Sequence, residues 1–157
     1  MKKFKWTDLF IFIVSAELVG AVSALLSNGF TEFYRSLVQP PLSPPAILFP
    51  IVWTILYALM GWSAYLIYSE DDAPDRAKAL ILYAVQLAVN FSWSIIFFRF
   101  QQLGAAAVTA VLLSILVAAM ILSFRKIRTK AAVLNIPYLL WSLFASYLAI
   151  ANWVLNK

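Results

Sequence analysis

The chain has 157 residues, a length that suits one domain. Hydrophobic residues make up 64% of it and charged residues only 12%, against the ~25% charged residues of a soluble globular domain. The net charge is +5, but the basic residues form no aromatic-interleaved face, which excludes nucleic acid as a partner. Cysteine and histidine are absent, which excludes disulfides, thiolate chemistry and the commonest metal ligand. The sequence therefore predicts a protein embedded in a lipid bilayer, with no metal site.

The first apolar segment, residues 9–28, is close to the ~20 residues that a bilayer requires and ends at Asn28-Gly29, a favourable helix C-terminus. Glu17 is the only acid well inside any predicted span. Its carboxyl is either a structural group bonded to a neighbouring helix or a functional one, because burying it in a membrane is costly. Small residues recur every fourth position and predict close helix packing: Ala16, Gly20 and Ala24.

Residues 30–45 form the longest connection and hold four prolines within six positions, 40–45. Each proline ring fixes φ and removes a backbone donor, so this stretch is predicted to be a rigid, non-helical lid loop. The next span, 46–69, carries Trp53, Tyr57 and Gly61 at i, i+4 and i+8, on one helix face. We interpret this face as one wall of a ligand pocket, although aromatic stripes also serve plain packing.

The third span, residues 77–98, carries Gln86, Asn90 and Trp93 on one face. Lipid offers no partners to amides, so the two amides must face protein or a cavity. They form either a structural interhelical hydrogen bond or the polar part of a pocket. In the fifth span, Pro137 and Trp141 are likewise spaced i, i+4. The fourth span contains a predicted packing groove of small residues: Ala106, Ala110, Ser114 and Ala118.

The predicted fold is therefore all-α, a single integral membrane bundle of five transmembrane helices over residues 1–157. Nine basic residues fall on the side of the N-terminus and three on the other side, which predicts a cytoplasmic N-terminus and an outside C-terminus. The lid loop then lies on the outer face. The predicted helices cover residues 9–28, 46–69, 77–98, 103–124 and 131–155.

Three motifs in order resemble the translocator protein family, also called tryptophan-rich sensory proteins and peripheral benzodiazepine receptors. The first is PPxxxFPxxWTxLYxLMG, from Pro44 to Gly61. The second is QLxxNxxWSxxFF, from Gln86 to Phe98, and the third is PYLxWxxFAxYL, from Pro137 to Leu148. The first loop departs from the family's usual WYxxLxKPxW, since Phe33-Tyr34 is followed by Gln39-Pro40.

The resemblance implies a homodimer of five-helix bundles with a pocket beneath the first loop. Family members bind porphyrins such as protoporphyrin IX and haem, and isoquinoline or benzodiazepine drugs. Some bacterial relatives degrade porphyrins in light, and the two tryptophans implicated there match Trp53 and Trp141. Other pocket-lining positions of the family match Tyr34, Pro45, Asn90, Trp93 and Ala145.

We therefore expect a membrane receptor or sensor for porphyrins and other flat apolar polycyclic molecules, with porphyrin as a ligand and no required cofactor. Light-dependent porphyrin degradation in the same pocket, with Trp53 and Trp141 as catalytic residues, is the enzyme alternative; porphyrin or lipid transport is another. A bacterial cell membrane is the expected location. The candidate ligand-binding residues are Tyr34, Pro45, Trp53, Tyr57, Gln86, Asn90, Trp93, Pro137, Trp141 and Ala145.

Overall fold

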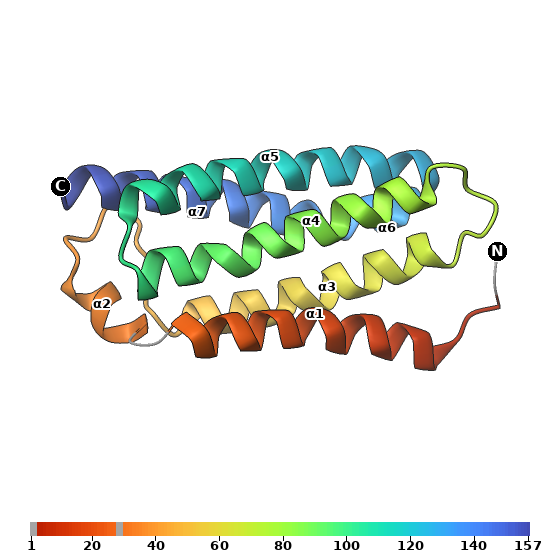
Figure 1. Ribbon diagram of the computed structural model, residues 1–157, viewed down its shortest axis with the longest axis horizontal. Coiled ribbons are helices and arrows are strands. Elements are labelled where there is room, and N and C mark those ends of the chain that lie inside the picture. Colours follow the sequence, from red (N-terminus) through yellow and green to blue (C-terminus); the bar gives the residue numbers. More distant parts are fainter. Residues whose placement is uncertain (1–2, 28–29) are drawn as a thin grey trace.

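A computed structural model describes residues 3–27 and 30–157 and confirms the predicted all-helical membrane fold. Within this part of the chain, five helical segments are long and apolar enough to cross a bilayer. They run antiparallel, and the two termini lie at opposite ends of the bundle (Figure 1). The elements are α1 (Trp6–Ser27), α2 (Phe30–Ser36), α3 (Leu48–Tyr68), α4 (Arg76–Ser94), η1 (Ile95–Arg99), α5 (Leu103–Ile127), α6 (Thr129–Val133) and α7 (Ile136–Leu155).

Helix α1 packs along α3, and α5 packs along both α7 and α4. Gly61 allows the α1–α3 contact, because a Cβ there would lie 2.6 Å from the backbone oxygen of Phe12. Part of the groove of small residues on α5 faces α7, where the hydroxyls of Ser114 and Ser146 lie 2.9 Å apart. Ala110 is buried beside Ala149 of α7. Close approach of helices through small residues therefore holds both pairs together.

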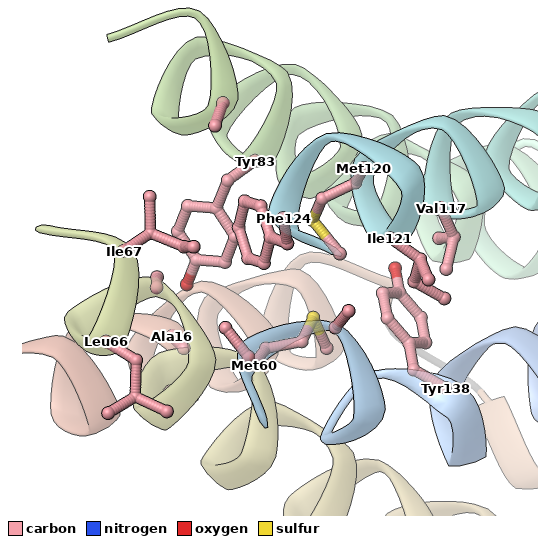
Figure 2. Packing of buried hydrophobic residues seen from close by; sticks show 14 of the residues in the cluster. Ala16, Met60, Leu66, Ile67, Tyr83, Val117, Met120, Ile121, Phe124 and Tyr138 are labelled. Atoms are coloured by element: carbon pink, nitrogen blue, oxygen red, sulfur yellow. The ribbon is translucent and has the colours of Figure 1, made fainter. Parts of the chain in front are cut away.

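Most members of the largest buried cluster, part of which is shown in Figure 2, lie in the half of each helix away from α2. Figure 2 shows Met60 of α3, Tyr83 of α4 and Tyr138 of α7 around the α5 residues Met120 and Phe124. Met60, Met120, Phe124 and Tyr138 are fully buried. These side chains pack closely at this end of the bundle, and the main cavity lies in the half toward α2.

The lid loop differs from its prediction at its start, where the structure has the short helix α2; residues 37–47 are non-helical, as the prolines require. The predicted helix end at Asn28-Gly29 lies outside the described residues. Tyr34 Oη donates a hydrogen bond of 2.7 Å to the carbonyl of Pro44, and burial raises the pKa of Tyr34, which keeps this hydroxyl a donor.

The C-terminal end of α7 holds the lid from the other side. Asn156 accepts a hydrogen bond from Val38 N at 2.8 Å and donates one to Val38 O at 3.1 Å. Tyr147 Oη donates to the carbonyl of Pro41 at 2.7 Å. We call these three bonds the lid clasp. The clasp fixes an irregular segment, whose backbone groups lack helical partners, to a regular one.

Two spans contain breaks that hydropathy does not indicate. The third ends in the π-helix η1, where Phe100 N donates to Ile95 O at 3.0 Å, one residue further back than in an α-helix. The fifth is divided at Asn135 into α6 and α7. Asn135 is fully buried, and its Nδ2 donates to Ser63 Oγ of α3 and to Ala131 O, each at 3.0 Å or less.

Candidate ligand cavity

A cavity of about 380 Å³ lies between α1, α3 and the α4–η1 segment, in the half of the bundle nearer the lid. It extends from Glu17 and Tyr57, near the middle of their helices, to Ser27 and Phe49 at the lid end. Its volume falls within the ~300–1,000 Å³ of small-molecule sites. The lining residues are Glu17, Gly20, Ala21, Ala24, Ser27, Phe49, Pro50, Trp53, Thr54, Tyr57, Trp93, Ser94 and Phe98.

Five of the thirteen lining residues are aromatic, and all five come from α3 and the α4–η1 segment. The helical spacing of Trp53 and Tyr57 places their rings side by side, with centroids 5.7 Å apart. Trp93 stacks on Phe97 at 5.2 Å and donates its indole N–H to the carbonyl of Ala106 at 3.1 Å. These contacts hold the rings in place before any ligand arrives, which reduces the entropy lost on binding.

Gly20 of α1 is required for the position of Tyr57. A Cβ at Gly20 would lie 2.3 Å from a carbon of the Tyr57 ring, closer than any real contact. The glycine therefore lets the ring cross against α1 at the deep end of the cavity.

Beneath Tyr57 a buried hydrogen-bond network joins α3, α4 and α7. Tyr57 Oη donates to Asn90 Oδ1, and Asn90 Nδ2 donates to Tyr138 Oη at 2.8 Å. Tyr138 in turn donates to Gln86 Oε1 at 2.7 Å. The two amides thus form interhelical hydrogen bonds of the kind that hold membrane helices together. The network also fixes the Tyr57 ring, so structural and pocket roles coincide at Asn90.

Glu17 lies in the wall of this cavity near the middle of α1 and is half-buried. No described residue forms a hydrogen bond or ion pair with its carboxyl group, so the structural role of a bond to a neighbouring helix is not observed. An acid at the centre of a membrane span costs roughly 2.5–3.5 kcal/mol. A charged or donor group inside the cavity would offset that cost.

The structure brings some of the candidate residues together. Trp53, Tyr57 and Trp93 line the main cavity, and Asn90 reaches it through Tyr57. Ala145 meets Trp93 in two small side chambers of about 10 and 20 Å³, each with room for about one water. Trp53 and Asn90 also line the smaller chamber, and Tyr34 lines the larger.

Other candidates lie elsewhere. Gln86 is fully buried in the network, and Pro45 is exposed on the lid. Pro137 and Trp141 share a face, as their spacing predicts, but that face lines an open apolar groove between α3 and α7. Trp141 contacts Phe49 at 6.0 Å between centroids, so one ring separates it from the main cavity.

Sequence reasoning assigned no pocket role to several wall residues. Gly20 and Ala24 belong to the predicted packing ridge and also line the cavity. Gly20 does pack closely against Tyr57 of α3, and Ala16 of the same ridge is fully buried. Phe49 and Phe98 belong to the motifs quoted above, in the same motifs as Trp53 and Trp93. That proximity in sequence is the signal from which their place in the cavity wall could be predicted.

Together, the five spans and this cavity define a class of protein: a helical integral membrane protein with an aromatic-lined cavity between its helices. Comparison with known sequences narrows this class, because the sequence model of the TspO/MBR family matches residues 10–154. The chain therefore belongs to the TspO/MBR family.

Named relatives span bacteria and animals. The chain is 38% identical over 125 residues to the tryptophan-rich protein TspO of Chlorobaculum tepidum, covering 79% of each chain. It is 37% identical over 132 residues to the translocator protein of Ovis aries, covering 83% of this chain and 78% of that one. It is 32% identical over 151 residues to the tryptophan-rich sensory protein of Cereibacter sphaeroides, covering 96% and 92%.

Proposed function

We propose that this protein is a membrane receptor or sensor that binds porphyrins, such as protoporphyrin IX and haem, and related flat apolar ligands in the main cavity. The observation that carries the proposal is the set of rings around a space of about 380 Å³, with Trp53 and Tyr57 on one side and Trp93 and Phe98 on the other. Flat conjugated ligands bind well between such rings, because each ring contact adds stacking to apolar burial. The names of the relatives, which include a sensory protein, support a receptor function.

Haem and metal-free porphyrin would be held in the same way. The chain has no histidine or cysteine to serve as an axial ligand, so packing on the rings would supply the affinity. In this proposal the porphyrin is a ligand of the protein.

Light-dependent degradation of porphyrin is a second candidate function, favoured by the position of Trp53. Its indole lies in the cavity wall, where it could pass an electron to an excited ligand. Trp141 lies behind Phe49 and outside the main cavity, so the two tryptophans would have different parts in any such reaction.

We also propose a bacterial cell membrane with the N-terminus in the cytoplasm, and a homodimeric assembly. The charge distribution supports the orientation, because most basic residues lie at the end of the bundle that holds the N-terminus (Figure 1). Those at the lid end are Arg35, Arg99 and Lys157.

Titration of the purified protein with protoporphyrin IX in the dark tests the binding function. Trp53→Ala removes a wall ring, and we expect it to weaken porphyrin affinity by about tenfold or more, since each stacked ring contributes ~1–3 kcal/mol. Trp6→Ala is the matched control, because Trp6 lies at the start of α1 and is 76% exposed. Equal affinities of the wild type and Trp53→Ala would rule out this cavity as the site.

A further inference from the structure

The Glu17 carboxyl marks the deep end of the cavity as chemically different from the lid end. It lines the cavity together with Tyr57 near the middle of the spans, whereas Phe49, Phe98 and Ser27 line the cavity toward the lid end. No described protein group forms a hydrogen bond or ion pair with it. A carboxyl in apolar surroundings needs a partner, and here the space in front of it is the cavity itself.

Four of the six other polar groups of the wall have their donor hydrogens engaged by the protein. Tyr57 donates to Asn90, Thr54 donates to Pro50 O at 2.7 Å, and the Trp93 indole donates to Ala106 O at 3.1 Å. Ser27 donates to Ser23 O at 2.6 Å. The remaining donors, Trp53 Nε1 and the Ser94 hydroxyl, are neutral, and none of the described wall residues is Lys or Arg. The wall therefore offers negative charge and lone pairs to a ligand, and no positive charge.

Aromatic faces complete this arrangement. Trp53, Tyr57 and Trp93 line the same space as Glu17, and the negative face of an aromatic ring attracts cations, most strongly for tryptophan. A carboxylate combined with such rings is a chemical match for an organic ammonium or iminium group. An anionic group would meet the Glu17 carboxylate without a compensating cation.

We propose that the deep end of the cavity, beside Glu17, favours a positively charged nitrogen on a flat polycyclic ligand. This inference rests on the proposed ligand cavity and adds a ligand class to it. It also gives a bound porphyrin one orientation: its acidic side chains lie toward the lid end, away from Glu17. Glu17 is thus the residue that determines the charge preference of the site.

Three probes with one ring system test the charge preference: N-methylacridinium as the cation, acridine as the neutral ring and acridine-9-carboxylate as the anion. Their affinities are measured by fluorescence titration in a nonionic detergent at neutral pH, for the wild type and Glu17→Gln. Asp8→Asn is the matched control, because it removes an acid from the same helix outside the cavity.

For the wild type and Asp8→Asn we expect the affinity for the cation to exceed that for acridine by about tenfold or more. A desolvated site that combines a carboxylate with aromatic faces can supply this ratio. Glu17→Gln should abolish this ratio while acridine affinity stays the same, which also shows that the variant is folded. If Glu17→Gln does not fold, Glu17→Asp, which keeps the charge, should retain the preference for the cation.

Two results would overturn the proposal. The first is equal wild-type affinity for cation and anion, which needs no variant. The second is a cation preference that survives in Glu17→Gln. In both cases acridine binding would leave the proposed function intact. If acridine and protoporphyrin IX both failed to bind the wild type, the proposed function would fail together with this inference.

Discussion

Two buried tyrosines on neighbouring helices allow a sharp test of the hydrogen-bond network. Tyr57 is 7% exposed and donates to Asn90, whereas Tyr83 is 9% exposed and its hydroxyl has no partner among the described residues. The same change, Tyr→Phe, removes one hydroxyl from each. Tyr57→Phe leaves the buried Asn90 Oδ1 without its donor. Tyr83→Phe instead removes a hydroxyl that loses its water on folding and gains no hydrogen bond in exchange.

For Tyr57→Phe we expect a loss of about 1–2 kcal/mol in the free energy of unfolding. At roughly 2–4 °C per kcal/mol for a chain of this size, the thermal midpoint should fall by about 2–8 °C. Tyr83→Phe should leave the midpoint unchanged or raise it. Porphyrin affinity should be retained in both variants, because the Tyr57 ring remains in the cavity wall.

Circular dichroism melting in detergent measures both midpoints under the same conditions. Equal shifts for Tyr57→Phe and Tyr83→Phe would refute the reasoning, because the network would then contribute nothing beyond the burial of a ring. A large loss of porphyrin affinity in Tyr57→Phe would show that the hydroxyl, and not only the ring, contacts the ligand.

Three further predictions concern the wall, the packing and the lid. Trp53→Phe and Trp141→Phe keep an aromatic ring, so porphyrin affinity in the dark should weaken only modestly. The rate of porphyrin bleaching under light should then follow the fraction of protein that has porphyrin bound. A loss of bleaching without a loss of binding would favour the photodegradation function. Ala110→Leu should lower the thermal midpoint, because Ala110 is 3% exposed against α7, and an unchanged midpoint would show that this contact is not a tight interface. Asn156→Ala removes both bonds to Val38 and should speed porphyrin dissociation in stopped-flow mixing, unless the lid does not cover the exit.

The five spans could be predicted because a bilayer imposes length and hydropathy on each helix separately. Helical spacing also identified residues that share a face: Trp53 with Tyr57, and Pro137 with Trp141. Spacing does not indicate which neighbour a face meets. The Pro137–Trp141 face has the same spacing as the Trp53–Tyr57 face, but it lines an open groove and not the main cavity.

The remaining features depend on contacts between segments far apart in the sequence. Gly20 belongs to the cavity only because Tyr57 of another helix crosses it. The break at Asn135 is accompanied by a bond to Ser63, 72 residues away. The sequence alone does not show whether the Glu17 carboxyl has a partner. The packed helices show that no described side chain forms a hydrogen bond or ion pair with it.

The π-helix η1 has a consequence for comparing this chain with its relatives. Bonding from Phe100 back to Ile95 accommodates one residue more than an α-helix would over the same length. Without that residue, each later side chain would turn by about 100° around the helix axis, and Phe98 would leave the cavity wall. An alignment with a relative that continues here as a regular α-helix therefore needs a one-residue gap after Ser94; otherwise it would match Phe98 with a residue that points away from the ligand.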